Sequence, residues 1–258
     1  MAVLDRLRVY PVKALDGIDV EAASLTPGGT LARDREFALF DGDGDVVNGK
    51  RTAAVHDLET SFDPASDELV VDAPGSKRAR FDLGRESGRA GATRWFGAYF
   101  DVDVTLRRDR SLGYVDRRTM GPSVIATATL EAVAGWFEDL TVDGVRRRMR
   151  ANLEVGGVEP FWEDRFVGTD APAFEVGGIR FEGVTPCGRC VVPERDPNSG
   201  ERTPDFRERF VEKREETFPG WADEAAFDHF YSLMTITRVR KADRDGTLSV
   251  GDAVSVVE

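Results

Sequence analysis

Apolar and polar residues alternate over short runs throughout the first seventy residues of the chain. A period of two indicates strands that are buried on one face, and turn signals such as Asp41-Gly42-Asp43-Gly44 separate the runs. Several short strands at this spacing favour a barrel or a sandwich over βαβ units. The expected strands are 4–12, 18–27, 35–41, 44–50, 56–63 and 67–73.

The pattern becomes mixed in the rest of the chain. Helical spacing predicts helices at 91–100, 127–140, 205–218 and 222–233. Strands are expected at 102–108, in a hairpin at 174–184, and at 234–241 and 248–257. The remaining segments are expected to be a Gly-rich loop at 75–92, a connection between two halves at 109–121, and a basic segment turning into a strand at 146–157.

Composition places the chain among globular proteins, with 41% hydrophobic and 32% charged residues. No apolar run is long enough to cross a bilayer, and the N-terminus lacks the apolar stretch of a signal peptide, so a cytoplasmic location is expected. The net charge is −12, and only five of the 35 basic residues are lysine. This acidic, lysine-poor composition favours a halophilic protein, with a GC-rich genome as the alternative explanation. It argues against nucleic acid or an anionic membrane as a partner.

The two cysteines of the chain, Cys187 and Cys190, share one Pro-Cys-Gly-Arg-Cys turn. A thiolate is a soft metal ligand and a nucleophile, and Arg189 places a cation beside both sulfurs. The spacing alone leaves open a redox dithiol, although the turn comes late in the chain and follows a hairpin. It also leaves open two cysteines packed as small apolar residues.

A structural zinc site within the chain is disfavoured, because zinc needs four ligands and no second pair of cysteines or histidines exists. The two histidines, His56 and His229, are isolated in the sequence. We interpret each as a structural or surface residue.

Several motifs occur together and in a fixed order, and they resemble the MOSC family, which contains the C-terminal domain of molybdenum cofactor sulfurases and the mitochondrial amidoxime-reducing component. The resemblance covers essentially the whole chain, including an N-terminal β-barrel domain that accompanies MOSC. The motifs are Tyr10-Pro11-Val12-Lys13 followed by Gly17, Arg33-Asp34-Arg35, Met149-Arg150-Ala151-Asn152-Leu153, Glu159-Pro160-Phe161, Glu163-Asp164, Cys187-Gly188-Arg189-Cys190, Asp196-Pro197-Asn198-Ser199-Gly200 and 246–254.

The resemblance implies that Cys190 coordinates molybdenum carried by a pterin dithiolene, the molybdenum cofactor (molybdopterin). Cys187 is not implied to be a ligand. The residues implied to hold the pterin and its phosphate are Lys13, Arg35, Arg150, Asn152, Gly188 and Arg189. An anionic cofactor in a protein of charge −12 needs a local cationic pocket, and arginines supply bidentate donors. Taken without the motifs, these residues are more typical of other positions: Lys13 of a surface strand edge, Arg35 and Arg150 of ordinary ion pairs, and Asn152 of a turn.

The sequence departs from the family pattern at three places. Ala14 stands where a small polar residue is usual, so one hydrogen bond to the cofactor is absent. Ala151 replaces a proline, which reduces loop rigidity. The segment Arg118-Thr119-Met120 replaces a more acidic and polar one at the expected wall on the substrate side.

We therefore expect a mainly β, β-barrel-like fold with a few helices. Two packed β-barrel domains, 1–115 and 116–258, should have the cofactor cleft between them. The expected function is a molybdenum-dependent oxidoreductase that reduces small N-hydroxylated or N-oxide substrates. The alternatives are a sulfurtransferase that carries a cysteine persulfide, and a carrier of the cofactor without enzymatic activity.

Electrons are expected to come from a separate ferredoxin, flavoprotein or haem protein. The chain has no Gly-x-Gly-x-x-Gly turn between a strand and a helix, as a Rossmann nicotinamide site requires. It also lacks the four cysteines that an iron–sulfur cluster usually needs, and the sequence ends at Glu258 without the ferredoxin-like domain of some relatives.

Overall fold

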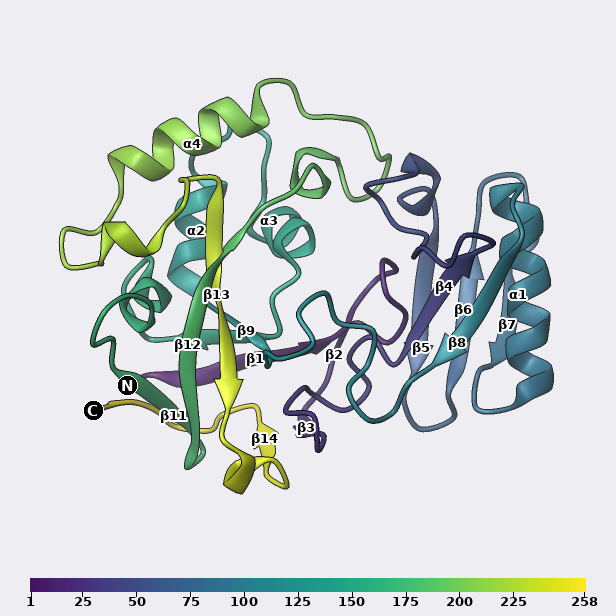
Figure 1. Ribbon diagram of the computed structural model, residues 1–258. Helices are drawn as coiled ribbons and strands as arrows, with labels where there is room; N and C mark the ends of the chain where they lie inside the picture. Colours follow the sequence, from purple (N-terminus) through teal and green to yellow (C-terminus); the bar gives the residue numbers. More distant parts are fainter.

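The computed structural model describes residues 1–258 and is organised around one large sheet of eight strands (Figure 1). The order across the sheet is β15-β11-β12-β13-β9-β10-β1-β2, and only the pair β9–β10 is parallel. The strands are β1 (Val3–Val9), β2 (Ile18–Asp19), β9 (Ser123–Ala126), β10 (Leu153–Gly156), β11 (Ala173–Val176), β12 (Ile179–Gly188), β13 (Ser232–Val239) and β15 (Val254–Val257).

Three small sheets complete the β structure, with orders β4-β8, β5-β6-β7 and β3-β14. The first two form a separate body with helix α1 on its outer face (Figure 1). The elements are β3 (Ala22–Ser24), β4 (Phe37–Asp41), β5 (Glu59–Asp63), β6 (Glu68–Asp72), β7 (Ala79–Asp82), α1 (Glu86–Phe100), β8 (Val104–Arg108) and β14 (Thr247–Ser249).

Strand β1 begins the chain but lies in the large sheet, whose other strands, β2 apart, come from residues after 122. It pairs antiparallel with β10, and its buried residues Leu4, Leu7 and Val9 share a core with residues such as Phe174 and Phe181. A second core, which includes Phe37 and Phe96, fills the body formed by β4–β8 and α1. The residues after β1 therefore lead directly from one core to the other.

Three helices, α2 (Thr127–Ala134), α3 (Val142–Met149) and α4 (Phe206–Glu216), pack on the large sheet around a third core (Figure 1). The hydroxyl of Thr141 accepts a hydrogen bond from the backbone N–H of Gly144 and caps the start of α3. The helix ends where the next residue, Arg150, takes a left-handed backbone conformation with φ of 59°.

The prediction of a mainly β fold with a few helices is confirmed, with four α-helices in the chain. No sheet closes as a barrel: one isolated bridge, Val3 to Ala253, links β1 to the residue before β15 without completing a ladder. No helix is long and apolar enough to cross a membrane.

Individual elements were predicted with mixed success. The hairpin at 174–184 and the helix at 205–218 are confirmed by β11–β12 and α4. The predicted loop at 75–92 is wrong, because it contains β7 and the first half of α1. The helix at 222–233 is also wrong, because that segment holds only a single 3₁₀ turn before β13. The helix at 127–140 ends at Ala134.

A buried acidic pair lies beneath the large sheet in the 3₁₀ helix Trp162–Phe166. Glu163 accepts hydrogen bonds from the backbone N–H of Ala126 and from the hydroxyl of Thr129, and Asp164 forms an ion pair with fully buried Arg214. Burial and the adjacent Asp164 charge raise the pKa of the Glu163 carboxyl. The folded state therefore binds a proton at Glu163 that the unfolded chain has released at neutral pH.

The substitution Glu163→Gln should reduce this dependence on pH, and Asp164, whose pKa burial also raises, should retain a contribution of its own. Because the folded wild type binds the extra proton, its free energy of unfolding should fall by up to about 1.4 kcal/mol per pH unit as pH rises from about 5 to about 8. Urea denaturation across this range should show a flatter profile for Glu163→Gln than for the wild type. Glu138→Gln, at an exposed position, should keep the wild-type profile. Parallel profiles for the wild type and Glu163→Gln would refute the assignment.

Candidate functional site

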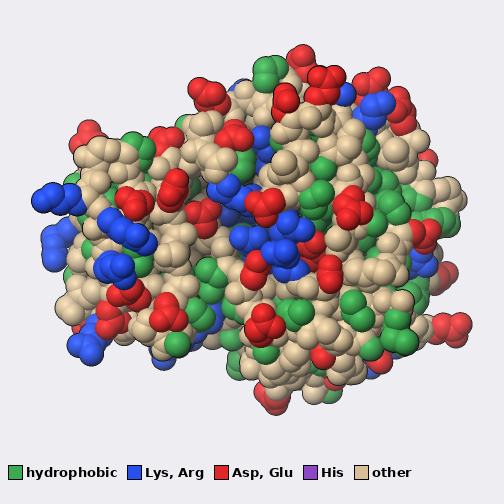
Figure 2. Space-filling view, turned by 180° about the vertical axis from the view of Figure 1, so that it is seen from behind, with side chains coloured by type: hydrophobic (Ala, Val, Ile, Leu, Met, Phe, Trp, Pro, Cys, Tyr) green, Lys and Arg blue, Asp and Glu red, His purple; other side chains and the backbone are tan.

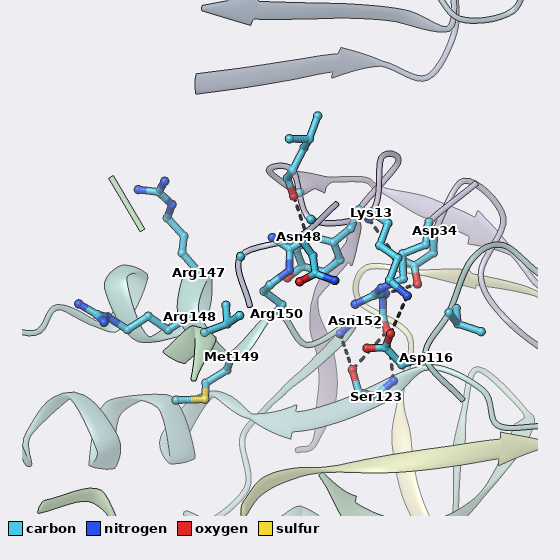
Figure 3. A pocket seen from close by; sticks show the side chains of 18 of the residues that line it. Lys13, Asp34, Asn48, Asp116, Ser123, Arg147, Arg148, Met149, Arg150 and Asn152 are labelled. Atoms are coloured by element: carbon cyan, nitrogen blue, oxygen red, sulfur yellow. Dashed lines mark hydrogen bonds and ion pairs between the residues drawn. The ribbon is translucent and has the colours of Figure 1, made fainter. Parts of the chain in front are cut away.

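The main pocket lies between the two bodies of the molecule and has a volume of about 240 Å³ (Figure 3). Its wall combines the connection between β1 and β2, the end of α3 and the cysteine turn with loops of the N-terminal half. The lining residues come from the segments 8–17, 30–35, 48–58, 115–123, 147–152, 187–197 and 234–236.

The pocket gathers positive charge in a protein whose net charge is −12. Ten of its lining residues are arginine or lysine, and only three, Asp16, Asp34 and Asp116, are acidic. Figure 2 shows Lys and Arg side chains gathered near the middle of one face, on a surface where acidic side chains are spread widely. The ten basic residues are Arg8, Lys13, Arg35, Lys50, Arg117, Arg147, Arg148, Arg150, Arg189 and Arg195.

Two of these arginines stack against the buried ring of Tyr10. The guanidinium carbon of Arg150 lies 4.1 Å from the ring centroid, and that of Arg35 lies 4.9 Å from it. Such cation–π contacts attract both cations to the ring. The hydroxyl of Tyr10 donates to the carbonyl of Ala151 at 3.2 Å, which fixes the ring beneath the pocket.

The two stacked arginines differ in how their charge is compensated. Arg35 forms an ion pair with Asp34, and although burial opposes its charge, this carboxylate raises the pKa of Arg35. Arg150 forms no ion pair and donates only to the carbonyl of Leu15, at 2.8 Å. Burial lowers the pKa of Arg150 to about 10, with the charge of Arg35 acting in the same direction. An anion in the pocket would stabilise this uncompensated cation.

Strained backbone concentrates around the pocket. Four lining residues other than glycine have φ in the left-handed region: Ala14 (76°), Arg35 (53°), Arg150 (59°) and Met234 (63°). This conformation costs about 1–3 kcal/mol per residue and clusters at functional sites. The positions of both stacked arginines therefore depend on support from the surrounding cores.

The cysteine turn places its two sulfurs in different environments. The Sγ of Cys187 accepts from Nη1 of Arg189 at 3.2 Å and from Nη1 of Arg117 at 3.7 Å. The half-buried Cys190 also lines the pocket, and its sulfur has no hydrogen-bond partner. No group of three or more His, Cys, Asp or Glu side chains is arranged to hold a metal ion. A metal at Cys190 therefore needs most of its ligands from a cofactor.

The other predicted site residues differ in whether they line the pocket and in what their side chains contact. Nζ of Lys13 contacts Asp116 at 2.6 Å on the pocket wall (Figure 3). The side-chain amide of Asn152 is occupied within the fold: it accepts from Ser123 and donates to the carbonyl of Arg8 at 3.1 Å. Gly188 is exposed at the end of β12 and does not line the pocket.

Four side chains of the pocket wall have buried nitrogens without a partner: Nε of Arg148, Nε of Arg189, Nε of Arg195 and Nε2 of His56. Buried polar groups are normally satisfied, so a group bound in the pocket would supply partners that the chain does not. Burial, with the charges of Arg195 and Arg150, lowers the pKa of His56. His56 thus lies at the pocket, where we had interpreted it only as a structural or surface residue.

Sequence reasoning also missed the role of α3 in positioning the cysteine turn. Arg148 is 3% exposed and donates to the carbonyls of Pro193 and Arg195, at 2.8 and 2.5 Å. Arg147 donates to Asn198 at 2.5 Å, within the segment Asp196-Pro197-Asn198-Ser199-Gly200 that follows the cysteine turn. The capping threonine at 141 is the signal that predicts this helix.

Comparison with known families identifies both halves of the chain. Residues 1–142 match the MOSC N-terminal beta barrel domain, and residues 122–255 match the MOSC domain. The protein therefore belongs to the MOSC family, and the predicted resemblance is confirmed.

The chain is similar, at low sequence identity, to amidoxime-reducing components and to molybdenum cofactor sulfurases. The chain is 22% identical to mitochondrial amidoxime-reducing component 1 of Xenopus laevis, over 78% of this chain and 67% of that protein. It is 27% identical to a molybdenum cofactor sulfurase of Caenorhabditis briggsae, over 76% of this chain but only 29% of that protein. Among solved structures, the YUAD protein from Bacillus subtilis is similar, with 12% identity, a TM-score of 0.42, and coverage of 99% of this chain and 96% of that one.

Proposed function

We propose that this protein binds the molybdenum cofactor in the pocket and reduces small N-hydroxylated or N-oxide substrates by two electrons. The observation that carries the proposal is the unpartnered sulfur of Cys190 on the wall of a pocket that contains ten basic residues. A thiolate is a suitable donor to molybdenum, and the cations suit an anionic pterin phosphate. Similarity to an amidoxime-reducing component supports the class of substrate.

The pocket residues fit such a cofactor by the chemistry of their donors. Arg150 carries an uncompensated charge, and Arg189 has a buried nitrogen without a partner. We assign Arg35 and Arg150 to the phosphate, and Lys13 and the buried Nε of Arg189 to other polar atoms of the cofactor. Asn152 acts as a positioning residue, because its amide groups join β1 to the start of β9 beneath the site.

The overall reaction breaks the N–O bond of the substrate, consumes two electrons and two protons, and releases water. The bound cofactor would supply the two-electron redox centre, while the chain binds, orients and shields it. Cys190 contributes a thiolate donor, and the surrounding guanidinium groups hold anionic groups in place.

The first test compares the two cysteines. Cys190→Ser should lose bound molybdenum, because it removes the proposed ligand, whereas Cys187→Ser should largely retain it. The measurement is the molybdenum content of natively purified protein, by mass spectrometry of the metal. Equal molybdenum content in the two variants would reject Cys190 as the specific ligand.

A second test addresses the two stacked arginines. Arg35→Ala and Arg150→Ala should each weaken cofactor retention about 10- to 100-fold, as is typical of lost charge-assisted hydrogen bonds. Retention is measured as cofactor released during dialysis, with circular dichroism to confirm folding. Arg94→Ala, at an exposed position on α1, is the matched control and should retain the cofactor. Unchanged retention in both pocket variants would place these arginines outside the cofactor site.

The electron source gives a third test. The chain carries no Rossmann fingerprint, so the purified protein should reduce benzamidoxime with dithionite and a viologen but not with NADH or NADPH alone. A separate ferredoxin, flavoprotein or haem protein would then be the donor in the cell. Robust turnover with NADH alone would contradict this expectation.

Sulfur transfer is a second candidate function, and one observation favours it. Two guanidinium groups donate to the sulfur of Cys187, an environment that would stabilise an anionic persulfide. Full molybdenum loading without activity under any reductant, together with a persulfide on Cys187 in intact-protein mass spectra, would support this function over the reductase.

A further inference from the structure

Arg117 is a pocket cation that the proposed cofactor site does not use. Its side chain is half-buried, forms no ion pair, and makes its one hydrogen bond to the sulfur of Cys187 at 3.7 Å. The next residue, Arg118, provides a contrast: its side chain is 62% exposed, lies outside the pocket and is 3.8 Å from Asp109. Two adjacent arginines therefore occupy very different electrostatic environments.

A second guanidinium meets the same sulfur. Nη1 of Arg189 lies 3.2 Å from Sγ of Cys187, and Nη2 of Arg189 donates to the carbonyl of Met149 at 3.1 Å. Nε of Arg189 is buried without a partner, and the residue forms no ion pair. Two cations thus converge on one atom, which is unfavourable unless an anion lies between or beside them.

The acidic residues of the pocket do not provide that anion. Asp34 pairs with Arg35, and Asp116 contacts Lys13 at 2.6 Å. Asp16 accepts from Thr60 at 3.0 Å and lies 3.6 Å from Arg147. The charge at Cys187 is therefore not compensated by the protein, and its natural partner is a bound anion.

We propose that Arg117 and Nη1 of Arg189, whose Nε is left for the cofactor, form an anion subsite at Cys187 that binds a carboxylate of the substrate. Their position supports this, because Cys187 precedes the proposed metal ligand by three residues, whereas the phosphate is assigned to Arg35 and Arg150. A guanidinium matches the two oxygens of a carboxylate in a planar, bidentate arrangement. Arg117 then determines specificity for acidic substrates. The identification of the anion as a substrate carboxylate rests on the proposed reductase function, whereas the existence of the anion subsite does not.

Substrate preference tests the role of Arg117 directly. The cofactor-loaded protein is assayed with neutral benzamidoxime and with 4-carboxybenzamidoxime, which differs by one carboxylate. The wild type should prefer the carboxylated substrate, and Arg117→Gln should reduce the ratio of the two kcat/KM values by about 10-fold or more. Arg118→Gln, which makes the same change of charge at the adjacent position, should keep the wild-type ratio. An unchanged ratio in Arg117→Gln would overturn the proposal.

A second measurement needs neither molybdenum nor an electron donor. In a Cys190→Ser background, Cys187 is the sole thiol, and its alkylation rate is measured with iodoacetate and with the neutral iodoacetamide. Because both reagents react with the same sulfur, the ratio of the two rates does not depend on its intrinsic reactivity. The ratio therefore measures how strongly the site attracts an anionic reagent. Arg117→Gln should lower this ratio by about 10-fold, and Arg118→Gln should not change it.

The two measurements separate the possible failures. A shifted alkylation ratio in a protein that reduces no amidoxime supports the anion subsite and rejects the reductase function. An alkylation ratio that Arg117→Gln does not change rejects the subsite, whatever the activity. Loss of molybdenum in Arg117→Gln with wild-type Cys190 would show that the bound anion belongs to the cofactor, and would also overturn the assignment to substrate.

Discussion

The packing of the guanidinium groups of Arg35 and Arg150 against the ring of Tyr10 is the interaction on which the site depends. It joins three distant parts of the chain: the residue after β1, the loop before β4 and the end of α3. Two like charges share one ring, but the protein supplies a carboxylate to only one of them. Both arginines also adopt left-handed backbone conformations. The free energy that maintains this arrangement must come from the surrounding cores, which is the usual source of support for strained functional sites.

The fold was predictable where local pattern determines structure. The alternating runs identified β5 and β6, which pair with each other and lie close in sequence. The pairing of β1 with β10 joins Leu7 to Leu153, and no local pattern specifies so distant a partner. Helix α3 was missed because three consecutive arginines mask a helix whose fully buried apolar residues are only Val145 and Met149. The absence of closed barrels likewise depends on long-range register.

Residues of the site could be predicted from the sequence only where they belong to a family motif. The residues taken from the motifs, Cys190 and Arg150 among them, do meet at one pocket, while Gly188 lies outside its lining. Arg117 and Arg195 were missed because nothing in their local sequence distinguishes them from the other arginines of the chain. Only tertiary placement shows that these two cations lack carboxylate partners. The metal ligand, the cofactor contacts, the cytoplasmic location and the adaptation to high salt stay predictions.

Positive charge is concentrated in the pocket and negative charge on the rest of the surface. This separation determines how ionic strength affects the binding of an anion. Because ten basic residues are concentrated there, the rest of the chain is more acidic than the net charge of −12 indicates. Exposed acidic groups repel an approaching anion from a distance. At physiological ionic strength, salt screens this repulsion beyond about 8 Å. Partly buried contacts with Arg150 or Arg189 act at hydrogen-bond distance and are screened much less. Added salt therefore weakens the repulsion by the surface more than the attraction in the pocket. An acidic protein with this arrangement retains its ability to bind an anion as ionic strength rises, whereas a binder that relied on a basic surface would lose it.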